Sequence, residues 1–114
     1  MPALAVTVAL SGSISGDVDV RQGMPYAIWC PTITSGDLLL QGNYDTTSAN
    51  FVRMQANAFY GAAVSGDLRL AAGPGSCMLI LSKDVQFPPY LRIETAVKQA
   101  AARSFQLLYR PGVR

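Results

Sequence analysis

The sequence predicts an all-β protein with a single domain, residues 1–114, folded as a β-sandwich. Half of the residues are hydrophobic and only 14% are charged, a balance that allows a packed core and excludes an acidic or low-complexity disordered chain. Apolar residues recur mainly at every second position in short segments, which Ser-Gly, Gly-Asn, Gly-Pro-Gly and Pro-Pro sequences separate. This close spacing favours a sandwich or barrel of about eight or nine strands, for which a jelly roll is one possible order.

The first segment shows the alternation most clearly. Large side chains stand at Leu4, Val6, Val8 and Leu10, with alanine or threonine between them, so one strand face is expected to be large and the other small. Further strands are expected at residues 18–20, 24–30, 38–41, 50–55, 68–71, 77–81, 90–95 and 104–110. Residues 95–102 contain Lys-Gln-Ala-Ala-Ala, which favours helix by propensity but spans only about two turns. We therefore expect at most one short helix there, with an ordered loop as the alternative.

Three Ser-Gly-Asp sequences, at 15–17, 35–37 and 65–67, each precede an apolar segment. Glycine allows positive φ, and serine and aspartate bond nearby backbone N–H groups, so the pattern predicts turns. A calcium site shared by Asp17, Asp37 and Asp67 is the alternative, but each loop lacks the acidic cluster that calcium loops carry. The chain also has no histidine and only two cysteines, so we predict no zinc site, no other metal and no cofactor.

The strand expected at 24–30 contains the single tryptophan. Tyr26 and Ile28 share one face of it, and Ala27 and Trp29 the other, as in a strand buried on both sides. We therefore predict that Trp29 is a core residue. The two cysteines, Cys30 and Cys77, stand in apolar surroundings, which predicts buried reduced thiols, with a disulfide as the alternative.

The composition argues against several classes of function. Without histidine, no Ser-His-Asp or Cys-His arrangement can form, and the seven acidic residues are not paired as in a glycosidase, so we predict that the protein is not an enzyme. The net charge of +2 is spread along the chain without a basic run, which argues against nucleic acid as a partner. The apolar run at residues 1–10 is far shorter than the roughly 20 residues of a membrane span, so no membrane contact is expected.

Several segments resemble a family of small structural proteins of tailed bacteriophages. Residues 37–47 read Asp-Leu-Leu-Leu-Gln-Gly-Asn-Tyr-Asp-Thr-Thr, where that family has an apolar strand ending in Gln-Gly-Ser, then Asp-Gly-Thr and an aromatic residue, here Phe51. Residues 90–95, Tyr-Leu-Arg-Ile-Glu-Thr, are similar to its apolar-Lys/Arg-Ile-Arg-Ser-Gly-Thr strand. Residues 97–103, Val-Lys-Gln-Ala-Ala-Ala-Arg, are similar to its Val-Asn-Gln-Ala-Ala-Asp-Arg connection. The order agrees over residues 26–111, with Asn43, Thr46 and Lys98 as departures.

The resemblance implies a sandwich carried in a virion and assembled in the host cytoplasm. Our leading hypothesis is a capsid decoration, or cement, protein that binds the major capsid protein or other virion proteins. The first alternative is a tail, baseplate or head-spike module that binds host glycan, and the second is an unrelated soluble adaptor. From size and avidity we expect self-association as a trimer. The residues expected to contact a partner are Phe59, Tyr60, Arg53, Arg69, Lys83 and Arg92.

Overall fold

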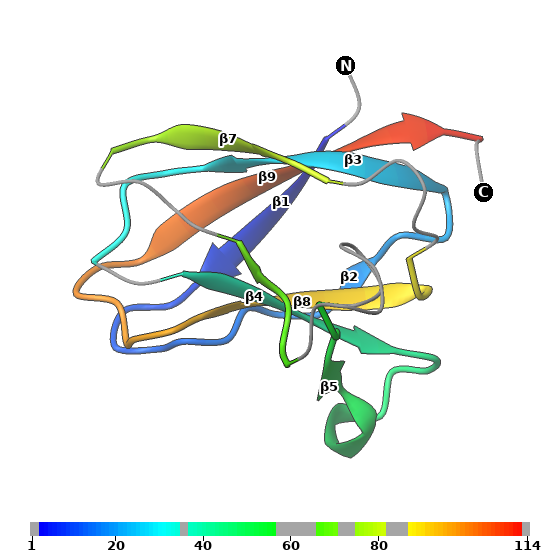
Figure 1. Ribbon diagram of the computed structural model, residues 1–114, viewed down its shortest axis with the longest axis horizontal. Coiled ribbons are helices and arrows are strands. Elements are labelled where there is room, and N and C mark those ends of the chain that lie inside the picture. The colour runs from blue at the N-terminus through cyan, green and yellow to red at the C-terminus, as the bar shows by residue number, and fades with distance from the viewer. Residues whose placement is uncertain (1–2, 35–36, 57–65, 71–74, 82–86, 113–114) are drawn as a thin grey trace.

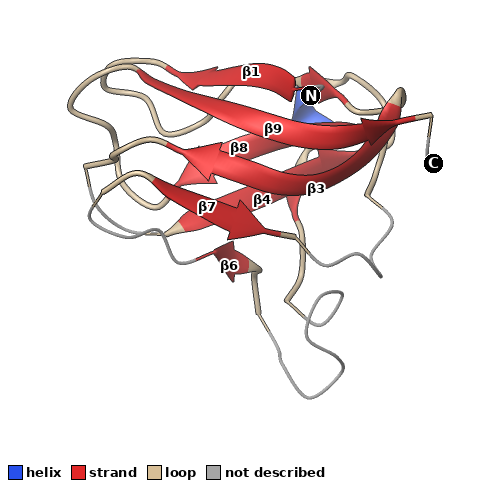
Figure 2. Cartoon of the chain, turned by 90° about the horizontal axis from the view of Figure 1, so that it is seen from above, coloured by secondary structure: helices blue, strands red, loops and turns tan. Residues whose placement is uncertain are grey.

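A computed structural model of the chain describes residues 3–34, 37–56, 66–70, 75–81 and 87–112. These residues form two antiparallel sheets, of four and five strands, packed face to face (Figures 1 and 2). The strands are β1 (Ala3–Val8), β2 (Val18–Asp19), β3 (Gly23–Cys30), β4 (Leu38–Asn43), β5 (Val52–Arg53), β6 (Arg69–Leu70), β7 (Cys77–Ile80), β8 (Tyr90–Thr95) and β9 (Arg103–Pro111), with a 3-10 turn, η1 (Ser48–Asn50), before β5. The predicted all-β sandwich is confirmed.

The strand pairing is nested from the ends of the chain inward. β1 pairs with β9, β2 with β8, β3 with β7, and β4 with β6, all antiparallel. The four-stranded sheet has the order β1-β9-β3-β7, and the other sheet has the order β2-β8-β4-β5, with β6 also paired to β4. A chain folded back on itself and wrapped into two sheets in this way has the connectivity of a jelly roll. β5 is an addition to this plan, beside Gln41 and Gly42 of β4.

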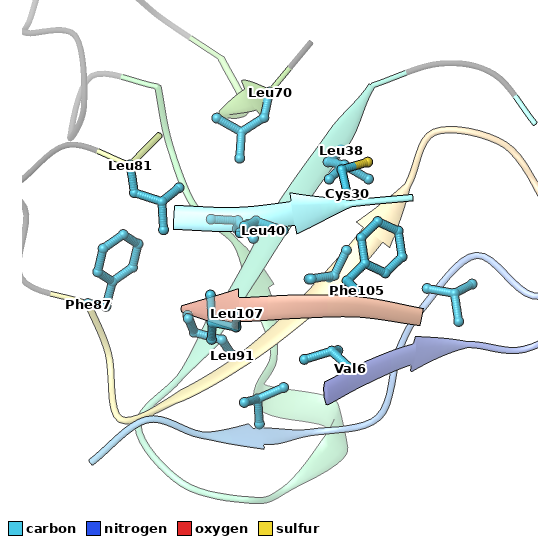
Figure 3. Close-up of a cluster of buried hydrophobic side chains, with 14 of the residues drawn as sticks. Val6, Cys30, Leu38, Leu40, Leu70, Leu81, Phe87, Leu91, Phe105 and Leu107 are labelled. Atoms are coloured by element: carbon cyan, nitrogen blue, oxygen red, sulfur yellow. The ribbon is translucent and has the colours of Figure 1, made fainter. Parts of the chain in front are cut away.

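The core lies between the sheets, as Figure 3 shows. Alternation directs Val6 and Val8 of β1 inward and leaves Ala3 and Ala5 outside, as predicted from the large and small faces of that segment. The prediction is wrong for Leu10, because β1 ends at Val8 and the chain turns at Leu10, which is 63% exposed. The other sheet contributes the inward side chains of β4 and β8. Fully burying one leucine or phenylalanine side chain contributes about 1.5–3 kcal/mol. The most buried members include Ile28, Leu38, Leu40, Leu68, Phe87, Leu91 and Phe105.

Strand β3 departs from simple alternation near its start. Its pairing with β9 shifts register between Pro25 and Ala27, which makes Tyr26 the extra residue of a bulge. β7 pairs with β3 only from Ala27 onward, so Pro25, which has no N–H to donate, stands where that side of β3 has no ladder partner among the described residues. Beyond the bulge, Ile28 and Cys30 face the core.

Residues 95–102 form an ordered loop without helix. The buried side chain of Gln99, which is 1% exposed, holds this loop in place. The Gln99 Oε1 atom accepts a hydrogen bond from the Thr34 N–H at 2.8 Å, and its Nε2 donates to the Val97 carbonyl at 3.0 Å. Burying and satisfying both ends of this amide outweighs the modest helix propensity of the alanines. In the described part of the chain, no helix has the length and apolar character needed to cross a membrane.

Of the three Ser-Gly-Asp sequences, the one at 15–17 lies wholly within the described residues, and the turn predicted there is wrong: Ser15 forms an isolated antiparallel bridge with Val8, and Gly16 has no positive φ. The chain is extended here because buried Ser15 is tied to β8, where its Oγ accepts a hydrogen bond from the Ile93 N–H at 2.9 Å. In the third sequence Gly66 has φ +92°, the left-handed conformation that glycine tolerates. Residues 35, 36 and 65 lie outside the described residues.

Candidate functional site

The two sheets present different outer surfaces. The outer face of the five-stranded sheet is polar, with Gln41, Arg53, Arg92 and Glu94 on neighbouring strands. The outer face of the four-stranded sheet carries exposed apolar side chains beside the edge strand β7.

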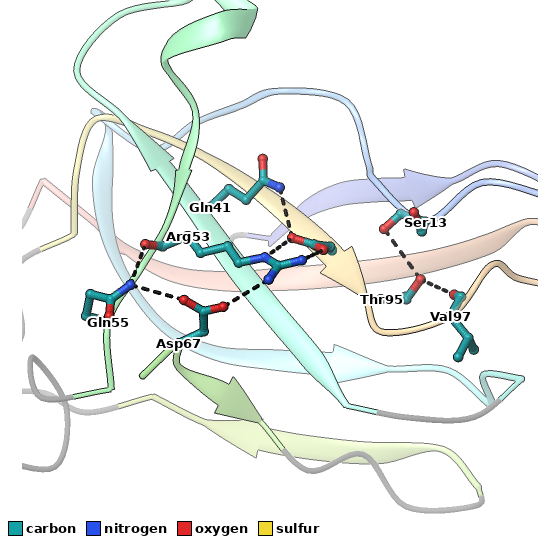
Figure 4. Close-up of polar contacts among 8 residues, drawn as sticks. Ser13, Gln41, Arg53, Gln55, Asp67, Thr95 and Val97 are labelled. Carbon is teal, nitrogen blue, oxygen red and sulfur yellow. Dashed lines mark hydrogen bonds and ion pairs between the residues drawn. The ribbon is translucent and has the colours of Figure 1, made fainter. Parts of the chain in front are cut away.

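Arg53 is the centre of the polar cluster on the five-stranded sheet (Figure 4). Its Nε and Nη2 atoms donate to the two Glu94 carboxylate oxygens at 3.0 and 2.7 Å, and its Nη1 donates to Asp67 at 2.9 Å. Gln41 donates to Glu94 at 2.9 Å, and Gln55 donates to Asp67 at 3.1 Å. This planar, bidentate geometry is the strongest arrangement of an arginine–carboxylate pair. The cluster joins β4, β5 and β8 to the segment before β6.

Electrostatics fix the charge state of this cluster. The hydrogen bond from Arg53 is the main cause that holds the pKa of Glu94 below its usual range, ahead of the opposing effect of burial. The same guanidinium, followed by the Gln55 amide, lowers the pKa of Asp67. Both carboxylates are therefore stabilised as anions that accept hydrogen bonds. Such a group is held in place as a structural clamp and is a poor proton donor near neutral pH.

Arg92 is engaged in a second set of contacts. Its Nε donates to Asp17 at 2.6 Å, its Nη2 donates to the Ser48 hydroxyl at 3.2 Å, and its guanidinium lies 3.8 Å from the centroid of the Phe51 ring. An arginine that stacks on an aromatic ring and pairs with a carboxylate has little freedom left. Arg92 thereby fastens η1 and the start of β5 onto β8.

A hollow of about 520 Å³ opens beside these two clusters. Tyr44, 76% exposed, stands at the turn after β4, and the side-chain amide of Asn50 donates to its hydroxyl at 3.2 Å. Gly42 and Pro88 both line the hollow and lie close together. Only glycine fits at position 42, because a Cβ there would lie 2.5 Å from Cγ of Pro88. The lining consists of Gly42, Asn43, Tyr44, Ala49, Asn50, Val52, Arg53, Met54 and Pro88.

The outer face of the four-stranded sheet holds an apolar strip, which we define as Trp29, Met78 and Ile80. Trp29 is 39% exposed, Met78 48% and Ile80 74%. Trp29 stands directly opposite Met78 in the β3–β7 register, and Ile80 stands opposite the buried Ala27. The prediction that Trp29 is a core residue is therefore wrong. Alternation placed Trp29 correctly on the face opposite Ile28, but no described element covers that face.

The two cysteines face one another behind the strip. Cys30 and Cys77 are register partners across β3 and β7, and both are free thiols, but only Cys30 is buried as predicted, whereas Cys77 is partly exposed. Burial, followed by the neighbouring Cys77, raises the pKa of the Cys30 thiol to about 12. Cys30 therefore stays protonated and packs as an apolar core side chain, which makes it a poor nucleophile. Among the described residues no cluster of acids and cysteines has the size to hold a metal ion.

Three of the six residues expected to contact a partner lie on the five-stranded sheet, and the other three are not among the described residues. Arg53 and Arg92 are paired within the chain, and Arg69 of β6 is exposed on the strand next to β4. Phe59, Tyr60 and Lys83 lie outside the described residues. Sequence reasoning missed the apolar strip and the exposed ring of Tyr44. The exposure of Tyr44 could have been predicted, because this aromatic residue stands in the polar sequence Asn-Tyr-Asp-Thr-Thr.

The chain matches no family model, no curated protein and no solved structure. The sandwich architecture therefore stands on the structure itself, and the phage family remains a prediction from the quoted segments.

Proposed function

We propose that this chain is a non-enzymatic virion structural protein of a tailed bacteriophage, and that it decorates the capsid and stabilises the head. The observation that carries the proposal is the apolar strip of Trp29, Met78 and Ile80, which is exposed on the four-stranded sheet. Adjacent exposed apolar side chains on a folded domain mark surfaces that bind other proteins. The aromatic and methionine side chains of the strip are types enriched at the centres of such interfaces.

Two further arguments support this reading. The nested pairing is that of a jelly roll, an architecture used by viral capsid domains and by lectins, although a fold alone does not fix a function. The segments at 37–47, 90–95 and 97–103 resemble those of small phage structural proteins. Together these arguments favour a role in a virion over an unrelated adaptor.

Sedimentation with phage particles tests the proposal. The purified protein is mixed with emptied heads that lack it and, separately, with unassembled capsid subunits. We expect it to sediment with the heads and to bind the free subunits much more weakly, because several modest contacts reinforce one another only on a lattice. Binding to neither, or equal binding to both, would refute the decoration role.

The alternative is a tail, baseplate or head-spike module that binds host glycan, and the hollow beside Tyr44 favours it. An exposed aromatic ring next to side-chain amides such as Asn50 is a surface on which a sugar can stack and form hydrogen bonds. A glycan array probed with the wild-type chain and with Tyr44→Ala tests this role. Binding that the substitution abolishes, together with no binding to heads, would establish the alternative over the decoration role.

A further inference from the structure

Among the described strands, β7 is the edge of the four-stranded sheet, beyond β3 (Figure 2). The Leu81 N–H donates to the Tyr26 carbonyl of β3 at 2.9 Å. In an antiparallel ladder the backbone groups of successive residues point alternately to the two sides. Because Leu81 points toward β3, Leu79 also does, and Met78 and Ile80 therefore direct their N–H and C=O groups to the open side.

Within its four described residues, this edge lacks the charge, the proline and the bulge that often prevent strands from pairing between molecules. Exposed edges are commonly protected by lysine, by proline or by a bulge. The four residues of β7, Cys-Met-Leu-Ile, include no charge and no proline, and their pairing with β3 is regular. The two residues with outward backbone groups, Met78 and Ile80, also carry the exposed side chains of the apolar strip.

We propose that β7 pairs antiparallel with the β7 of a second copy, about a two-fold axis at Leu79. This register sets Met78 opposite Ile80 of the second copy. Both residues have outward backbone groups, so each such pair exchanges both of its N–H···O=C bonds. The side chains of the same pairs meet on the outer face, where apolar cross-strand contacts stabilise the pairing. Two four-stranded sheets thereby become one continuous sheet.

A second copy is the occupant that fits this edge because the edge is complementary to itself. A two-fold contact brings the same patch of each molecule together, so a charged patch would repel its copy, whereas this one carries no charge. The opposite edge, β1, is less suited. Its outward side chains, Ala3, Ala5 and Thr7, offer little apolar surface, and Val8 at its end is already bridged to Ser15.

The dimer would double the apolar strip without covering it, since edge pairing leaves the outer face of both sheets exposed. The pairing does not depend on the proposed virion role, because it uses only the backbone of β7 and its own side chains. It also differs from the trimer expected from the sequence, since a two-fold contact closes with two copies.

The experiment compares Met78→Pro with Met78→Ala by light scattering over a concentration series. Proline removes the outward N–H of Met78, which has no partner within its own sheet, whereas alanine removes the same side chain and keeps that N–H. We expect the wild-type mass to rise from 12.1 kDa to twice that value with concentration, Met78→Ala to dimerise with at most about tenfold weaker affinity, and Met78→Pro to remain monomeric. A wild-type monomer at all concentrations, a trimer, or a Met78→Pro dimer as stable as that of Met78→Ala would overturn the proposal.

Amide hydrogen exchange of the wild-type chain keeps the test decisive if Met78→Pro does not fold. The Met78 and Ile80 amides should exchange slowly at high protein concentration and quickly at low concentration. The Leu79 amide, directed at β3, should be protected at both. Concentration-independent exchange at Met78 and Ile80 would contradict pairing through β7, whether or not the protein binds phage heads.

Discussion

Replacing Trp29 with alanine should destabilise the fold less than replacing Phe105. Phe105 is 0% exposed between the sheets, and removing a buried phenylalanine costs about 3–5 kcal/mol because a cavity remains. Trp29 is 39% exposed, so roughly three-fifths of an aromatic contact area of about 150–250 Å² is lost, or roughly 90–150 Å². At about 25 cal/mol per Å² this is an upper bound of about 2–4 kcal/mol. Alanine keeps part of the contact and no closed cavity forms, so we expect about 2 kcal/mol for Trp29→Ala against about 4 kcal/mol for Phe105→Ala.

Urea unfolding followed by far-UV circular dichroism measures both free energies with one probe. Fluorescence is unsuitable because Trp29 is the single tryptophan, and its replacement removes the signal. The slope of the free energy against urea should be the same in both variants, so that the midpoints report stability alone. A loss in Trp29→Ala equal to or greater than that in Phe105→Ala would show that Trp29 is a core residue, and would remove the basis for the apolar strip.

Three further outcomes follow from particular contacts. Gly23→Ala should cost about 1–3 kcal/mol in urea unfolding, because its Cβ would collide with the Arg110 carbonyl and the Tyr109 ring, whereas Gly75→Ala, which meets open space, should change little. Arg53 lowers the pKa values of Asp67 and Glu94 in the folded protein. The two carboxylates therefore contribute fully to the unfolding free energy above their ordinary pKa of about 4, and this contribution is lost as the pH falls below that value. Between about pH 6 and pH 2, the unfolding free energy of Arg53→Met should therefore fall less steeply than that of the wild type, and equal slopes would contradict the clamp. A chelator or a reductant should leave the thermal midpoint unchanged, and a fall of more than about 8 °C would show that the fold needs a metal or a disulfide.

Local patterns in the sequence predicted most of the strands because alternation is a local steric property. The strand predicted at 90–95 has the same bounds as β8. In β1, the predicted large face is the buried side of the strand and the predicted small face is the exposed side. The segment at 50–55 was predicted too long, because a 3-10 turn occupies residues 48–50 and only Val52 and Arg53 pair with β4.

The surfaces could not be predicted in the same way, because they depend on contacts between residues far apart in the sequence. Alternation assigned Trp29 to one face of its strand, but whether a further layer covers that face is decided by the rest of the fold. Likewise, nothing near Arg53 indicates that its carboxylate partner is Glu94, which is 41 positions away. The predicted partner contacts treated each arginine as free, whereas the structure pairs Arg53 and Arg92 internally.

The central claim is that the protein binds the phage head through the outer face of its four-stranded sheet. Its most direct test is the affinity of Ile80→Asp and of Val52→Asp for emptied heads, measured by sedimentation at concentrations at which the wild type and both variants are monomeric, so that a lost β7 pairing cannot account for a weaker affinity. The two residues are matched, since both are β-branched, lie on strands and are 74% and 66% exposed, but they belong to opposite sheets. Burying an unpaired carboxylate in an apolar contact is costly, so Ile80→Asp should weaken binding by at least about tenfold, while Val52→Asp should stay within about twofold of the wild type. Equal affinities of the two variants, or a greater loss in Val52→Asp, would contradict the claim.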